Sequence, residues 1–164
     1  MRQKLLHVAL SGMNQRIYTG YFADCYVLAP ERTAAFVISF LTHFVPNHSP
    51  TQDEYEFPHH GPETTETFAS AEDLIDFLTK DSGASYAMYW TNNDKSEIRF
   101  AQCFFTNDGH LIVGLSCECE GYPVTTTEEA IFNRIKAFCG GAPGYITYES
   151  PAPDNLYEFL RAAE

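Results

Sequence analysis

Apolar positions in the first third of the chain follow the spacing of strands and then the spacing of a helix. Aromatic and β-branched residues gather in Leu5–Leu10 and in Tyr21–Leu28, which predicts two strands with a turn at Ser11–Asn14 between them. A helix is predicted between Pro30, which opens it, and Pro46, which stops it. Its apolar residues form a stripe about 100° wide on one helical face: Phe36, Val37, Phe40, Leu41 and Phe44.

A short strand, a loop and a second helix are predicted next. Tyr55 and Phe57 alternate with glutamates, as expected of a strand with one solvated face. Residues 58–62 begin and end with proline and contain a glycine, which predicts a loop. Ser70 is followed three residues later by an aspartate, a helix N-cap pattern, so we expect a helix from there to about Lys80.

The middle of the chain predicts a β-meander of three consecutive antiparallel strands. Tyr86–Trp90 is predicted as the first strand, with a polar turn at Thr91–Lys95. Asn107-Asp108-Gly109 is a hairpin signal, because Asp-Gly supplies the positive φ angles of a tight turn, and His110–Cys117 is the returning strand. In the strand between the two turns, alternate residues are expected to share a face: Ile98, Phe100, Gln102 and Phe104.

A helix, a strand and a short helix are predicted to complete the chain. Thr126 has a glutamate three residues later, as in an N-cap, and Gly140-Gly141 fits the C-terminal end of the same helix. Tyr145–Glu149 is predicted as a strand and Asn155 as the N-cap of a last short helix. The longer helix has apolar residues at helical spacing: Ile131, Ile135 and Phe138.

The order of these elements predicts an α+β fold, because strands that follow one another directly pair antiparallel. We expect a single domain over residues 1–164, mainly an antiparallel sheet with a central β-meander and about four helices packed against it. A length of 164 residues suits one domain with its own core.

Composition narrows the classes of partner and the compartment. The formal net charge of −12 argues against nucleic acid or an anionic membrane as the main partner. No apolar run reaches the roughly 18 residues of a membrane span, and no signal peptide is visible. The five cysteines are an odd number without the spacing of a disulfide framework, which predicts reduced thiols in the cytoplasm.

Acidic residues are concentrated in one stretch of the chain. Residues 51–80 carry eight acidic side chains and one basic, whereas residues 1–50 carry four basic and two acidic. A localised negative field speeds association with a basic partner, although acidic surfaces also serve solubility alone. We therefore expect a protein partner to bind at these residues and near the end of the meander: Asp53, Glu54, Tyr55, Glu56, Glu63, Glu66, Glu118 and Glu120.

Two groups of residues suggest other chemistry. His59 and His60 lie among acidic residues, as in a general base with an orienting carboxylate, but no nucleophile motif accompanies them. Cys117 and Cys119 would share one face of a strand, and a soft metal could bind them together with one of these histidines or His110. Burial as free thiols is the commoner fate of such cysteines. We predict no catalytic residue, no metal and no cofactor.

Three stretches resemble a known class of bacterial protein: Tyr89-Trp90 ahead of the meander, residues 105–116 and residues 144–153. They are similar to small, acidic, single-domain immunity proteins, which are encoded beside polymorphic toxins. The resemblance covers the C-terminal half and implies a cytoplasmic protein that binds one toxin, commonly a basic nuclease, and blocks its active site or its substrate access. These families share no functional residues, so none is carried over to this chain.

The leading hypothesis is therefore a non-enzymatic inhibitory binding protein, present as a monomer or a small homo-oligomer. The alternative is a small-molecule-binding or hydrolytic domain that uses the His59/His60 loop, which predicts a concave pocket with perturbed histidine pKa values. A structural or oligomerising module, with a flat apolar patch and a symmetric dimer, is a third hypothesis.

Overall fold

The computed structural model describes residues 21–164, in which strands and helices alternate much as predicted. The predicted strand at Leu5–Leu10 and turn at Ser11–Asn14 lie outside the described residues. In chain order the described elements are β1 (Tyr21–Leu28), α1 (Ala34–Phe44), β2 (His48–Pro50), β3 (Tyr55–Phe57), β4 (Glu66–Phe68), α2 (Ala71–Lys80), β5 (Tyr86–Asn92), β6 (Ile98–Phe105), β7 (Leu111–Cys119), α3 (Thr126–Phe138), β8 (Gly144–Tyr148) and α4 (Leu156–Ala162).

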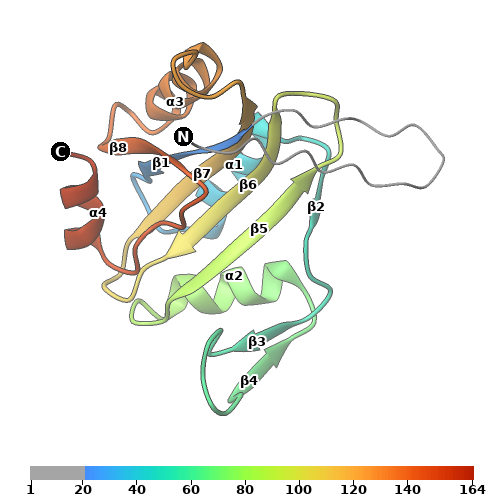
Figure 1. Cartoon of the computed structure of the whole chain (residues 1–164). Helices are drawn as coiled ribbons and strands as arrows, with labels where there is room; N and C mark the ends of the chain where they lie inside the picture. The colour runs from blue at the N-terminus through green and yellow to red at the C-terminus, as the bar shows by residue number, and fades with distance from the viewer. Residues whose placement is uncertain (1–20) are drawn as a thin grey trace.

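Six strands form one antiparallel sheet that curls into a half-barrel (Figure 1). Its order is β2-β5-β6-β7-β1-β8, and the neighbours β5, β6 and β7 are the predicted meander. At the β6–β7 hairpin, Gly109 has a φ of +88°, the left-handed conformation that a tight turn requires and that glycine adopts freely. The predicted α+β class and antiparallel pairing are confirmed. The remaining strands, β3 and β4, pair with each other outside this sheet.

A β-bulge in β6 changes which of its residues share a face. The pairing of β6 with β7 shifts register between Ile98 and Phe100, so that Arg99 is an extra residue on the β6 side. Ile98 consequently belongs to the main core with Ala101, whereas Phe100 faces the other side of the sheet. The prediction that Ile98 and Phe100 share a face is therefore wrong, because strict alternation takes no account of the extra residue.

The main hydrophobic core lies on one face of the sheet, beneath α1, α2 and α3. All five residues of the stripe predicted for α1 are buried. This helix begins after the N-cap Thr33, whose hydroxyl accepts a hydrogen bond from the Phe36 amide at 3.1 Å, so the predicted start at Pro30 is too early. The α2 helix begins at the predicted N-cap, Ser70. None of the four helices between residues 21 and 164 has the length and apolarity needed to cross a membrane.

The α3 helix is anchored to the core by Ile131 and Ile135, as its spacing predicts. Its N-cap is Thr125 instead of the predicted Thr126. The Thr125 hydroxyl donates to the Glu129 carboxylate at 2.6 Å and makes no hydrogen bond with a backbone amide of the first turn. The side-chain pair at the start of the helix is therefore Thr125 with Glu129, whereas the sequence pattern suggests Thr126 with Glu129.

Residues 21–164 cover the opposite face of the sheet only in part. The α4 helix lies beside β8 at one edge of the molecule (Figure 1). A small apolar cluster forms under α4 and the segment that precedes it: Tyr26, Phe104, Ile112, Ala152 and Phe159. We call the rest of this side the open face.

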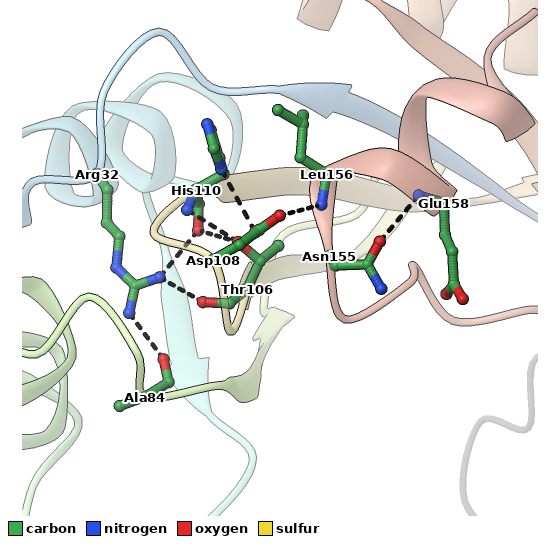
Figure 2. A network of polar contacts seen from close by, with 8 residues as sticks. All are labelled: Arg32, Ala84, Thr106, Asp108, His110, Asn155, Leu156 and Glu158. Atoms are coloured by element: carbon green, nitrogen blue, oxygen red, sulfur yellow. Dashed lines mark hydrogen bonds and ion pairs between the residues drawn. The ribbon is translucent and has the colours of Figure 1, made fainter.

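Arg32, in the link between β1 and α1, ties the sheet to the end of α2. Figure 2 shows its contacts with the β6–β7 hairpin and with Ala84. Its guanidinium donates hydrogen bonds to the β6–β7 hairpin, to the end of α2 and to the segment before β5. The acceptors, at 2.7 to 3.1 Å, are the backbone carbonyls of Leu78, Asp81, Ala84, Thr106 and His110. One side chain thereby fixes three segments that are distant in sequence.

The same hairpin also positions α4. The Asp108 carboxylate accepts a hydrogen bond from the Leu156 amide at 2.9 Å (Figure 2). Asn155 caps the helix as predicted, since its side chain accepts a hydrogen bond from the Glu158 amide at 2.9 Å. The C-terminal helix is thus held in place at the edge of the open face.

Candidate functional site

The acidic stretch of the sequence folds into a part of the molecule that we call the acidic module, residues 51–80 with β3, β4 and α2. Figure 1 shows β3 and β4 at one end of the molecule, beyond α2. The aromatic side chains of these strands pack on the helix, where the Phe77 ring centroid lies 5.0 Å from that of Phe57 and 5.1 Å from that of Phe68. The apolar residues of the acidic module thus face inward and leave its acidic residues in water.

The eight carboxylates of the acidic module are all exposed: Asp53, Glu54, Glu56, Glu63, Glu66, Glu72, Asp73 and Asp76. Within the described part of the chain, only Asp76 has a cationic partner, Lys80 at 2.5 Å, and both side chains of this pair are solvated. No lysine or arginine occurs in the sequence between Arg32 and Lys80. The other seven carboxylates therefore add their fields with no ion-pair partner among residues 21–164, over a screening length of about 8 Å at physiological ionic strength.

The predicted partner-binding residues fall into two groups. Glu118 lies at the end of β7 and Glu120 in the turn after it, beside α3 and away from the acidic module (Figure 1). Glu118 forms an ion pair with Arg99 at 3.2 Å. The structure brings the other carboxylates of the set together on the acidic module: Asp53, Glu54, Glu56, Glu63 and Glu66.

Tyr55 is the predicted partner-binding residue that the fold removes from the surface. Only 2 % of its surface is exposed, and its ring packs edge-on against Tyr86 at 6.3 Å between centroids. The alternation that exposes Glu54 and Glu56 turns the intervening tyrosine toward the core. The prediction of a partner contact is therefore wrong for Tyr55, which anchors the acidic module instead.

His59 lines a hollow of about 260 Å³ in the acidic module. Its imidazole is stacked between two rings, with centroids 4.3 Å from His60 and 4.3 Å from Tyr86. Burial, and secondly the neighbouring His60, lower the pKa of His59 from its ordinary 6.5, so the ring is neutral at pH 7. His60 itself is exposed. The other described residues that line the hollow are Gln52, Glu54, Glu56 and Tyr86. None of these is a serine, threonine or cysteine that could act as a nucleophile.

The two cysteines considered as metal ligands face the main core. Cys117 is fully buried and Cys119 is 6 % exposed, and both are free thiols, the commoner fate of such cysteines. Burial raises the pKa of Cys119 to about 11, whereas a metal binds the thiolate. His110 lies at the opposite end of β7. Among residues 21–164, no three His, Cys, Asp or Glu side chains are placed to hold a metal ion.

A larger hollow, of about 520 Å³, lies on the open face and contains none of the predicted site residues. Three buried polar side chains from neighbouring strands lie in it, Asp24 of β1, Gln102 of β6 and Ser116 of β7, each less than 8 % exposed. Gln102 Nε2 donates to Asp24 Oδ1 at 3.0 Å and lies 2.5 Å from Ser116 Oγ. The Ser116 hydroxyl donates to the same Asp24 oxygen. We call these three residues the Asp24 cluster.

Tyr26 supports one side of this hollow. Its hydroxyl donates to the Ser150 carbonyl at 2.6 Å and so holds the segment that follows β8, where Glu149 has a φ of +56°. Its ring lies against Gly114, where an added Cβ would come within 2.5 Å of a ring carbon, so this position requires glycine. Burial, and secondly the charge of Asp24, raise the pKa of Tyr26, which keeps its hydroxyl protonated as a donor.

The Asp24 cluster has a signal in the sequence that strand prediction alone passes over. Each of its residues is a polar side chain with an apolar residue directly before and after it in its strand. Register then brings them together, because Asp24 lies directly opposite Ser116 in the β1–β7 pair. Polar residues in three strands become one site only once the strand order is known.

The chain thus presents two candidate sites, the acidic module with its His59 hollow and the Asp24 cluster on the open face. No protein-family model, no curated protein and no solved structure matches this chain.

Proposed function

We propose that this protein is a non-enzymatic inhibitory binding protein that recognises a basic protein through its acidic module. The observation that supports this function is the set of seven exposed carboxylates with no cationic partner in the described part of the chain. Solvated carboxylates contribute little to the stability of their own fold. Their concentration on one module is therefore better accounted for by association with a positively charged surface.

The geometry favours recognition of a rather flat cationic surface. Glu56 lies in β3 and Glu54 directly precedes this strand, and both line the His59 hollow. The aromatic contact between Phe57 and Phe77 holds β3 on α2. Carboxylates on a supported strand need little further ordering when they bind, which preserves affinity. In line with the resemblance to immunity proteins, we propose a basic toxin as the partner and the cytoplasm as the compartment. The carboxylates would occupy the place that a polyanionic substrate takes on a nuclease.

The His59 hollow favours a second candidate function, binding or hydrolysis of a small molecule. A neutral imidazole held between two rings beside Glu54 and Glu56 has the composition of a general base with carboxylate neighbours. If this function is the true one, His59→Gln removes ligand binding or turnover, while reversal of the exposed charges away from the hollow changes neither.

Affinity capture from the source organism tests the proposed function. The baits are the wild-type chain, the triple variant Asp53→Lys/Glu54→Lys/Glu56→Lys, and a control with the same change in net charge elsewhere, Glu31→Lys/Glu97→Lys/Glu164→Lys. All six positions are exposed. We expect the wild type and the control to retain one basic protein at about 50 mM salt and to lose much of it at about 500 mM, where charges are screened within a few ångströms.

Retention of the same protein by the acidic-module variant would contradict the proposed function. Equal loss from both variants would show that net charge, and not the acidic module, determines the interaction.

A further inference from the structure

We propose that the hollow on the open face binds an organic cation, an amidinium, guanidinium or ammonium group on a flat apolar body, with Asp24 as the counter-ion. This inference does not depend on the proposed function. Of the residues that line the hollow, only Thr51 belongs to the acidic module, and it carries no charge.

The hydrogen bonds of Asp24 leave one of its oxygens available. Oδ1 accepts from Gln102 and Ser116, while Oδ2 has no partner in the described part of the chain. A carboxylate that is 93 % buried is ordinarily paired with a cation. The lining of the hollow within residues 21–164 contains no lysine, arginine or histidine, and the arginine of β6, Arg99, pairs with Glu118. The missing positive charge is therefore one that a ligand can supply.

The other polar groups of the hollow also call for a ligand that donates hydrogen bonds. Gln102 donates to Asp24 and to Ser116, and Ser116 donates to Asp24. The Thr51 hydroxyl donates to the Tyr89 carbonyl at 3.2 Å. The polar groups of the lining that remain for a ligand are mainly hydrogen-bond acceptors, including the Glu149 carboxylate. The Tyr89 hydroxyl is the exception, because it can also donate. An anion would meet two carboxylates and almost no donor, so the hollow discriminates against phosphates and carboxylates.

Aromatic walls complete the match to a flat cation. Tyr89 and Phe100 line the hollow, and Phe100 is 36 % exposed. The Tyr89 ring is held edge-on to Phe104 at 6.0 Å between centroids. Aromatic faces attract organic cations, and a volume of about 520 Å³ lies within the range of small-molecule sites.

Three probes of nearly identical shape test the proposal on the full wild-type chain: benzamidine, benzamide and benzoate, which are positive, neutral and negative at pH 7. Binding is measured by titration calorimetry and by NMR amide shifts. We expect millimolar or tighter affinity for benzamidine, with shifts at Asp24, Gln102 and Ser116, at least a tenfold weaker affinity for benzamide, and no binding of benzoate. Equal affinity for benzamide and benzamidine would overturn the proposal. So would the absence of benzamidine binding at about 10 mM, a concentration well above the expected dissociation constant.

Variants locate the site. Asp24→Asn keeps an acceptor oxygen but removes the charge, and should weaken benzamidine binding at least tenfold. Tyr89→Leu removes a wall without touching the Asp24 cluster and should weaken it several-fold, which keeps the test valid if Asp24→Asn folds poorly. Glu56→Gln on the acidic module should leave it unchanged. If Glu56→Gln lost benzamidine binding while Asp24→Asn kept it, the assignment of the site to the hollow on the open face would be contradicted.

A fourth probe, N-acetyl-arginine amide, distinguishes the source of the cation. Tighter binding of benzamidine indicates a free planar ligand, whereas tighter binding of the arginine derivative indicates the side chain of a protein. Both outcomes support an organic cation at Asp24.

Discussion

The acidic module and the open face both present carboxylates, but they hold them in opposite environments. The acidic module keeps eight in water, and only Asp76 is paired with a cation among the described residues. The open face keeps Asp24 in a hollow, 7 % exposed and hydrogen-bonded to two neighbours. Exposed carboxylates lower the stability of the fold little, and their field acts at a distance. Burial of Asp24 carries a desolvation penalty, and this carboxylate acts on a group in direct contact with it.

The two environments suit different kinds of recognition. Exposed charges raise the rate at which an oppositely charged surface arrives, and salt screens them. A buried carboxylate is screened far less and selects a ligand by hydrogen-bond geometry as well as by charge. One chain can therefore combine a long-range surface for a protein with a short-range site for a small cation.

Reversing charge on the acidic module is expected to have the largest effect. In Asp53→Lys/Glu54→Lys/Glu56→Lys, the association rate with the captured partner should fall about 10-fold or more, because the attractive field becomes locally repulsive. The measurement is surface-based binding kinetics at low and physiological salt. The control Glu31→Lys/Glu97→Lys/Glu164→Lys should change the rate far less. A fall that appears only in the dissociation rate would contradict charge steering.

Among the stability variants of the two regions, removal of the buried Asp24 carboxylate is expected to lower the free energy of unfolding most. Asp24→Leu leaves the donors of Gln102 and Ser116 buried without their acceptor, at a cost of about 1–3 kcal/mol in the free energy of unfolding. Asp24→Asn retains an acceptor and should lose less. On the acidic module, Glu56→Leu should stay within about 0.5 kcal/mol, as expected of a surface site. Urea unfolding compares the three variants, and equal losses at both sites would remove the distinction between them.

The Tyr26 hydroxyl sharpens the account of the open face at a smaller scale. Tyr26→Phe removes the hydrogen bond to the Ser150 carbonyl and should cost about 0.5–1.5 kcal/mol. The matched control is Tyr157→Phe, since Tyr157 is 69 % exposed. Faster hydrogen exchange after β8 should accompany the loss in Tyr26→Phe. An unchanged exchange rate there would show that this hydrogen bond does not hold the segment.

The smallest expected effect concerns His59. Its pKa is lowered in the folded state, so the unfolded chain binds the proton more strongly, and this group contributes stability above pH 6.5 that is lost as the pH falls through the folded pKa. NMR titration of the imidazole should give a value below 6.5. His60→Gln should raise it only partly, because burial is the larger cause. Full return to the ordinary value would mean that burial contributes little.

Sequence patterns predicted the parts of the fold in which local signals agree with the tertiary structure. The Asp-Gly turn identified the β6–β7 hairpin, and the helical stripe gave the buried face of α1. The three-residue strands β2 and β4 were not predicted, because His48-Ser49-Pro50 and Glu66-Thr67-Phe68 carry no alternating pattern and form only by pairing with β5 and β3. Pairing partners of this kind are not encoded locally.

The candidate sites divide in the same way. Charge density along the chain located the acidic module, since its carboxylates are neighbours in sequence as well as in space. The same pattern misplaced Tyr55, whose orientation depends on the packing of β3 against the core. The Asp24 cluster joins residues up to 92 positions apart, and only the strand order and register bring them together.

A growth assay tests the inhibitor proposal most directly. The captured basic protein is expressed in a bacterial host, alone and together with the wild-type chain, the acidic-module variant, the matched control or Asp24→Asn. We predict that the partner alone stops growth, that the wild type, the control and Asp24→Asn restore it, and that the acidic-module variant does not. Restoration by the acidic-module variant, or failure of the wild type to restore growth, would contradict the account.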